Sequence, residues 1–97
     1  MSGQIRITPE QMRGRASEYR TQASNVEDVI NNMDRLLDAL QSEWEGESSA
    51  AFADRFTELR PGFVAAKDLI DEIAASLDAT ANDIEDLDNQ IAGKYRS

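Results

Sequence analysis

The chain has 97 residues, a net charge of −9, five glycines and two prolines, which suits one small, mostly helical domain. Eight acidic side chains and no Lys or Arg lie between residues 68 and 93, so nucleic acid is excluded as a partner, because phosphate contacts require a basic surface. Cys and His are both absent, which removes disulfides, Cys- or His-based metal sites and the usual nucleophile–base pairs.

The N-terminal segment lacks the apolar region of a Sec signal. No stretch of the chain approaches the roughly 18 apolar residues of a membrane span. We therefore expect no transmembrane helix and no stable membrane anchoring. If the protein is exported, a feature other than an N-terminal signal must be recognised.

The segment "ITPEQM" predicts the start of a first helix. Thr8 suits the N-cap, Pro9 suits the first helical position, and Gln11 completes a capping box. Apolar residues then follow at alternating steps of four and three, which is typical of a heptad seam. These residues are Met12, Ala16, Tyr19, Ala23, Val26, Ile30, Met33, Leu37, Leu40 and Trp44. The pattern predicts a helix over about residues 8–44.

The turn is predicted at Trp44, Glu45 and Gly46. Trp44 is the only tryptophan and continues the seam, so part of its ring should lie in the core. Gly46 allows the chain to reverse in a short space. Ser48 and Ser49 are expected to serve as N-caps of the next helix.

A second helix is predicted over about residues 48–94, with the same alternation of steps. Its stripe consists of Phe52, Phe56, Leu59, Phe63, Ala66, Ile70, Ile73, Leu77, Thr80, Ile84, Leu87 and Ile91. Pro61 lies inside it and removes one backbone hydrogen bond, at a cost of about 3 kcal/mol. The stripe keeps its phase across this proline, so we expect a kink within one helix.

The predicted fold is all-α: a single helix–turn–helix hairpin domain over residues 1–97. The second helix is longer and overhangs the first from near Ile84, leaving a tail over residues 84–97. Additional apolar residues widen both stripes, namely Val29, Leu36, Leu69, Ala74 and Ala81. A lone hairpin cannot cover stripes of this width, so we expect two hairpins to form an antiparallel four-helix bundle.

Catalysis and metal binding are not expected. Ser48 and Ser49 have no base to activate them. Asp86, Asp88 and Gln90 resemble the start of a calcium loop, but Ile91 stands where such a loop requires glycine. The acidic residues are better explained as a solvated helix face, and we expect no enzyme activity and no cofactor.

Trp-Glu-Gly between two amphipathic helices in a chain of this length resembles the Trp-X-Gly family, the ESAT-like substrates of type VII secretion systems. The resemblance covers "ITPEQM", "EWEGESSAAF" and "LRPGF", and so nearly the whole chain. Near the C-terminus, a second motif resembles the export motif of Gram-positive members. Its four positions are Ile84, Asp88, Ile91 and Tyr95, which share one helix face. The mycobacterial form, Tyr-x-x-x-Asp/Glu, is absent.

The resemblance implies a protein secreted without a leader, cytoplasmic before export, and carried as a folded dimer by an FtsK/SpoIIIE-type ATPase. Its partner would be an identical chain or a paralogous family member, and a larger co-secreted toxin could accompany it. The implied role is a virulence-associated effector or co-secreted adaptor. Two alternatives remain open: a cytoplasmic chaperone for a larger type VII toxin, and a protein that disrupts membranes at low pH.

Overall fold

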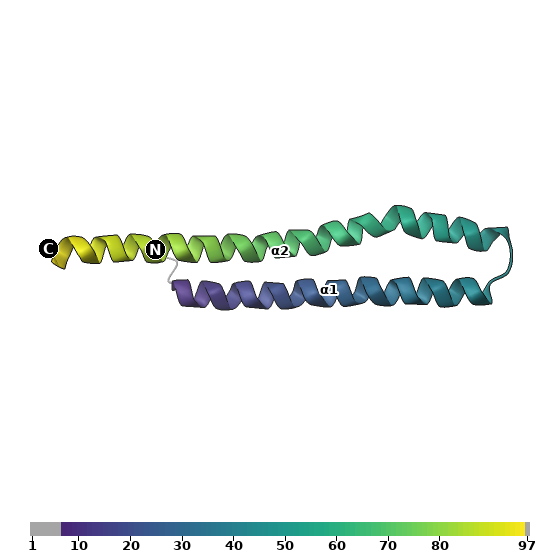
Figure 1. Ribbon diagram of the computed structural model, residues 1–97, viewed down its shortest axis with the longest axis horizontal. Helices are drawn as coiled ribbons and strands as arrows, with labels where there is room; N and C mark the ends of the chain where they lie inside the picture. The colour runs from purple at the N-terminus through teal and green to yellow at the C-terminus, as the bar shows by residue number, and fades with distance from the viewer. Residues whose placement is uncertain (1–6, 97) are drawn as a thin grey trace, which may run out of the picture.

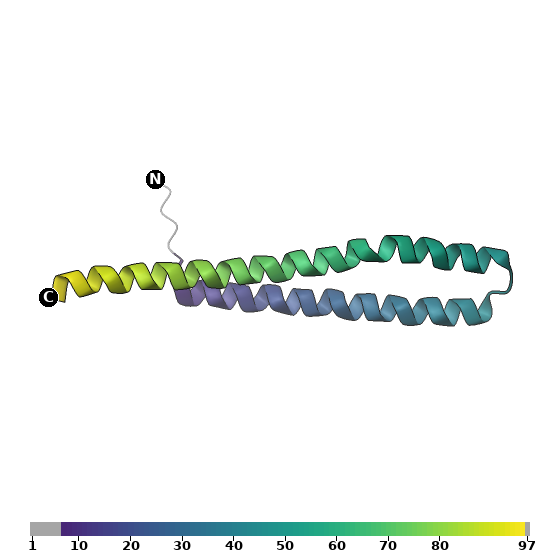
Figure 2. The same cartoon turned by 45° about the horizontal axis from the view of Figure 1, so that its top comes forward.

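The computed structural model describes the backbone of residues 7–96 and the side chains of residues 7–93. It contains two helices, α1 (Pro9–Glu43) and α2 (Glu47–Arg96). They lie antiparallel and side by side in a hairpin that measures 77 × 25 × 17 Å (Figures 1 and 2). The predicted helical hairpin is confirmed, and its helix ends fall within two residues of the predicted ones.

The start of α1 is held by the predicted capping box. The Gln11 backbone N–H donates to the Thr8 hydroxyl oxygen over 3.1 Å, and the Gln11 side-chain oxygen accepts from the Thr8 N–H over 2.9 Å. Pro9 follows directly, where its missing N–H costs nothing. These residues set where α1 begins.

The turn between the helices depends on Gly46. Trp44 is extended, its N–H donates to the Leu40 carbonyl over 2.9 Å, and Gly46 has a φ of 120°, a value that side-chain-bearing residues rarely adopt. Because the chain reverses at this glycine, α2 begins at Glu47, and the Ser49 N–H already donates to the Gly46 carbonyl over 3.2 Å. The expectation that Ser48 or Ser49 caps α2 is therefore wrong, since both lie inside its first turn.

Pro61 bends α2 without ending it. Helix α2 is continuous from Glu47 to Arg96, and Figure 1 shows it changing direction in the teal-to-green stretch that contains this proline. Pro61 cannot donate to the Thr57 carbonyl, so the local backbone ladder is short of one hydrogen bond. The predicted kink within one helix is confirmed.

The seam between the helices is built from small side chains. Ala16 and Ala23 of α1 are buried, as are Ala74 and Ala81 of α2, and Ile30 is the largest buried residue. Small residues at seven-residue intervals let the two backbones approach closely. No large apolar side chain among residues 7–93 is fully buried, so one hairpin leaves most of its apolar surface uncovered.

Candidate functional site

One edge of the hairpin carries a ladder of ion pairs between the helices. At the α1 start, the Arg13 guanidinium contacts Glu85 over 2.9 Å and donates to the Asn82 side-chain oxygen over 2.7 Å. One heptad further along, Arg20 pairs with Asp78. In both rungs the cation lies on α1 and the anion on α2.

The ladder then reverses its polarity. Lys67 of α2 lies 3.9 Å from Glu27 of α1 and 3.0 Å from Asp71 of its own helix. Arg60 of α2 binds both carboxylate oxygens of Asp34 over 3.0 and 2.9 Å. The α1 members of the ladder recur every seven residues, at 13, 20, 27 and 34. This seven-residue spacing of charged residues is the signal in the sequence from which the ladder could have been predicted.

The opposite edge is apolar. On both helices, the stripe residues outside the buried seam lie on the flank that faces away from the ladder, because helical periodicity turns them to that side. We call this surface the apolar edge, and its members among the predicted bundle-core residues are Met12, Tyr19, Val26, Met33, Leu40, Phe52, Phe56, Leu59, Phe63, Ile70, Ile73 and Leu77. Leu59 is 51% exposed and Phe52 is 44% exposed, so this edge lacks a cover in the single hairpin. The two other predicted core residues behave differently: Ile30 is buried in the seam, and Leu37 is half-buried.

Near the turn the apolar edge is hollowed into a groove of about 280 Å³. Its lining comes from both helices and consists of Met33, Leu36, Leu37, Leu40, Phe52 and Phe56. Trp44 lies beside it, with its ring centroid 5.7 Å from that of Phe52 and the planes tilted by 47°. Trp44 is half-buried, so its ring both anchors the turn and remains accessible, while Glu45 and Gly46 are exposed.

The border of the apolar edge is mostly uncharged around the middle of the hairpin. On α1 the neighbouring exposed residues include Gln22, Asn25 and Asn32, and on α2 they include Leu69 and Ser76. Glu72 is a charged exception, since it is exposed and lines a surface hollow together with Leu69 and Ser76. A second chain with the same negative charge therefore meets mainly neutral groups along this stretch, which limits the like-charge repulsion that a net charge of −9 causes.

The C-terminal part of α2 extends past the start of α1. The contact of Arg13 with Glu85 shows that α1 still lies alongside α2 there, so the overhang begins slightly beyond Ile84, which is half-buried. Asp88 is exposed, and Ile91 is 46% exposed. The Tyr95 side chain lies outside the described residues.

The turn and the tail lie at opposite ends of the molecule (Figure 1). One chain therefore does not bring Trp44 together with the predicted tail motif. If the two act as one surface, they must come from different chains.

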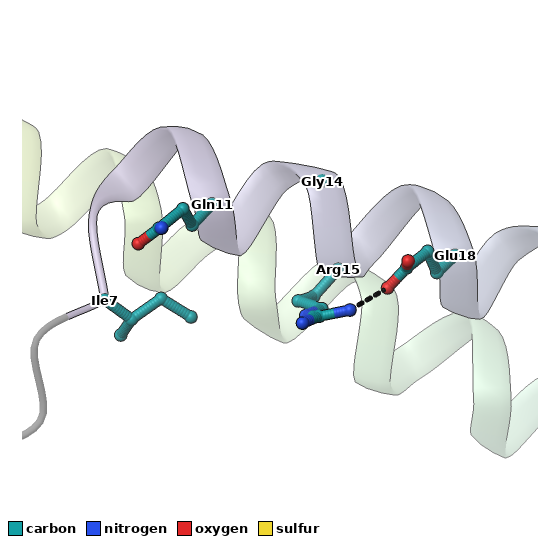
Figure 3. A pocket seen from close by; sticks show the side chains of 5 residues that line it. All are labelled: Ile7, Gln11, Gly14, Arg15 and Glu18. Carbon is teal, nitrogen blue, oxygen red and sulfur yellow. Dashed lines mark hydrogen bonds and ion pairs between the residues drawn. The ribbon is translucent and has the colours of Figure 1, made fainter.

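A shallow hollow of about 380 Å³ lies on the outer face of α1 near its start (Figure 3). Its lining is Ile7, Gln11, Gly14, Arg15 and Glu18, and Arg15 pairs with Glu18 over 2.8 Å within it. This local pair satisfies both charges, so the hollow offers no free group for chemistry. Among the described side chains, no cluster of three or more acidic groups could hold a metal ion.

Neither helix, over the described residues, has a segment long and apolar enough to span a bilayer.

Comparison with known protein families shows which family has this sequence pattern. Residues 4–89 match the model of the family described as proteins of 100 residues with WXG. The chain belongs to this family.

The relatives span the whole hairpin. Protein YukE of Bacillus subtilis is 40% identical over 96 residues, which is 99% of each chain. Type VII secretion system extracellular protein A of Staphylococcus aureus is 23% identical over 91 residues, 94% of each chain. The crystal structure of Geobacillus thermodenitrificans EsxA superposes with a TM-score of 0.81 at 43% identity, covering 95% of this chain and 99% of that one. The secreted protein EsxB of Bacillus anthracis shares the fold, with a TM-score of 0.78 at 22% identity over 90% of this chain and 99% of that one.

Proposed function

We propose that this WXG-family protein is a substrate of a type VII secretion system, exported as a folded dimer of hairpins and without catalytic activity of its own. The name of the Staphylococcus aureus relative, an extracellular protein of such a system, supports this assignment across nearly the full chain. The observation that carries the proposal is the placement of the Trp-Glu-Gly turn and the tail at opposite ends of a hairpin with an uncovered apolar edge. A second hairpin is needed to cover the apolar edge and to bring a tail beside the Trp-Glu-Gly turn.

The partner that fits best is a second copy of this chain. The apolar edge runs along both helices, and its mostly uncharged border in the middle of the hairpin favours the approach of two acidic chains there. Burying exposed side chains such as Leu36, which is 69% exposed, supplies the driving force. A paralogous family member with a similar apolar edge is the other candidate partner. Purifying the protein without its relatives distinguishes the two candidates, because only a homodimer can then form.

Antiparallel docking of two hairpins creates a composite surface. The overhanging tail of one copy, with Ile84, Asp88, Ile91 and Tyr95, then lies beside the other copy's turn. That turn presents Trp44, Glu45 and Gly46. We propose that an FtsK/SpoIIIE-type ATPase recognises this joint surface, which exists only in the dimer and so couples export to correct assembly.

After export, the protein acts as a virulence-associated effector or as an adaptor co-secreted with a larger toxin. Its elongated two-helix body suits a protein that works by binding. An adaptor role requires a further contact surface on the dimer, and the outer helix faces remain free for it.

Deleting the gene of the secretion ATPase tests the proposal. We expect the protein to disappear from the culture medium and accumulate in the cells, while a Sec-dependent protein is secreted normally in the same strain. Truncation of residues 84–97 should have the same effect while helicity, measured by circular dichroism, is largely retained. Normal secretion in the ATPase deletion strain would refute type VII export, and normal secretion of the truncated chain would refute the role of the tail.

A further inference from the structure

The hairpin has two halves that are held together differently. We infer that the turn half, residues 35–59, opens as one cooperative unit while the seam half, residues 9–34 and 60–85, stays folded. Pro61 sets the boundary between them. This opening is a property of the purified chain and does not depend on the proposed export.

The seam half is held by buried side chains and by ion pairs. All the buried apolar residues belong to it, namely Ala16, Ala23, Ile30, Ala74 and Ala81. Three rungs of the ladder join its helices through Arg13, Arg20 and Lys67, and the pair of Arg60 with Asp34 lies at its boundary with the turn half. These contacts form within one chain, so they hold the seam half whether or not a second copy covers the apolar edge.

The turn half is held less firmly. Ser49 is the only residue of this range that is buried. Among the described side chains its ion pair of Arg55 with Glu58 lies within α2, and none joins the two helices. Several large apolar side chains are exposed instead, among them Leu36 at 69% and Leu59 at 51%. Figures 1 and 2 show the helices lying further apart here than in the seam half. Opening the turn half therefore returns less buried apolar surface to water and costs less free energy.

The two arms of the turn half open together. These arms are residues 35–43 of α1 and 47–59 of α2. Neither is longer than the ~12–15 residues at which an isolated helix is marginal in water, so each depends on the other for stability. The contact of Trp44 with Phe52 joins them, as does the groove, which is lined from both helices. Loss of either arm removes these contacts from the other.

Pro61 is the position at which α2 begins when the turn half opens. In the closed hairpin this proline lies inside α2 and leaves the Thr57 carbonyl without its helical donor. In the open state the helix starts at Pro61 itself, where proline is favoured because the first helical N–H needs no partner. The proline therefore costs stability in the closed state alone, which lowers the free energy of opening.

Opening exposes Trp44 and the lining of the groove, while α1 keeps its capped start and its ladder. The Trp-Glu-Gly turn is thus the part of the molecule that changes shape first. A protein that binds the turn can select its closed or its open form without unfolding the rest of the chain.

Urea unfolding followed by two probes tests for this opening. Trp44 is the only tryptophan and lies in the turn half, so its fluorescence reports on that half, whereas circular dichroism reports on both helices. The fluorescence transition should occur at a lower urea concentration than the main loss of helicity. Coincident transitions would overturn the inference, because they would show that the whole hairpin unfolds as one unit.

Native-state hydrogen exchange maps the unit that opens. The amides of both arms should share one opening free energy and exchange at least about tenfold faster than those of the seam half, after correction for intrinsic rates. Different opening free energies in the two arms would overturn the cooperative unit. Equal protection in both halves would overturn the opening itself.

Two neighbouring substitutions locate the boundary. Pro61→Ala restores a donor to Thr57 in the closed state alone, so exchange of the turn-half amides should slow by about 10- to 100-fold. Gly62→Ala is the matched control, because a Cβ there meets nothing within 4 Å and residue 62 is helical in both states. Exchange of the turn half in this control should stay within about twofold of the wild type. An unchanged rate in Pro61→Ala, or an equal effect of Gly62→Ala, would overturn the role of Pro61.

Discussion

Arg60 holds Asp34 through two parallel hydrogen bonds of 3.0 and 2.9 Å, one residue before the proline that bends α2. The pair joins α2 to α1 directly beside the bend in α2, on the side of the molecule from which the helices continue to the turn. The bonds from Arg60 hold the pKa of the Asp34 carboxyl below its ordinary value of 3.8. At the other end of the ladder, Arg13 similarly holds the pKa of Glu85 below 4.5.

Replacing Asp34 with Asn should destabilise the hairpin in a pH-dependent manner. A carboxyl whose pKa is lower in the folded state stabilises the protein above its unfolded-state pKa, and this contribution disappears as the pH falls through the folded-state value. The difference in Tm between wild type and Asp34→Asn should therefore be present at pH 7, begin to shrink as the pH falls below 3.8, and disappear only below the lowered folded-state pKa. We expect it to be small, because both side chains are partly exposed to solvent.

Asp38→Asn is the matched control, since Asp38 is exposed, lies on the same helix and forms no ion pair among the described side chains. Thermal unfolding followed by circular dichroism between pH 3 and 7 provides the measurement. A wild-type advantage over Asp34→Asn that does not shrink between pH 7 and pH 3 would contradict the role given to this ion pair.

Two glycines should respond in opposite ways to alanine. A Cβ at Gly14 meets nothing within 4 Å, so Gly14→Ala should raise the free energy of unfolding by about 1 kcal/mol through helix propensity alone (Figure 3). Gly46→Ala also meets open space, but its φ of 120° is strained for alanine, so this variant should lose about 1–3 kcal/mol. Urea unfolding measures both, and stabilisation by Gly46→Ala would show that the turn does not depend on this backbone conformation.

The helices, the turn and the kink were predictable because each depends on local signals. The capping box at Thr8 sets one helix end, the unbroken heptad phase carries the chain past Pro61, and only glycine suits the reversal at residue 46. The start of α2 was placed one residue late because serine is a common N-cap, whereas here the glycine turn lets the helix restart directly after it.

Each apolar stripe contains residues that pack against the other helix and residues that face the apolar edge, and periodicity alone did not predict which residues do which. The heptad pattern treats Ala23 and Val26 as equivalent seam members, yet the first is buried against α2 and the second faces the apolar edge. The ion pairs escaped prediction for a related reason. Arg20 and Asp78 are separated by 58 positions, and their contact depends on how the two helices are aligned lengthwise.

Pro61→Ala should straighten α2 and stabilise the single hairpin. The substitution returns a donor to the Thr57 carbonyl and removes the steric clash of the proline ring, so a gain of up to about 3 kcal/mol is expected. A straighter α2 would also approach α1 more closely near the turn and narrow the groove beside Trp44. We therefore expect a higher Tm together with altered Trp fluorescence, and unchanged fluorescence would show that the bend does not shape the groove.

The last prediction separates the two roles of Trp44. Its ring contacts Phe52 across the turn but is only half-buried, so Trp44→Ala should cost about 1–2 kcal/mol and leave both helices formed. Export should nevertheless fall strongly, because the composite surface loses the accessible part of the half-buried indole. Trp44→Phe is the control, since it keeps an aromatic contact with Phe52 while removing the indole. The measurement is the amount of protein in the medium relative to the cells, read beside circular dichroism and sedimentation of each purified variant. Loss of export together with loss of the helices would make Trp44 a structural anchor, whereas loss of export from a folded dimer makes it part of the recognised surface.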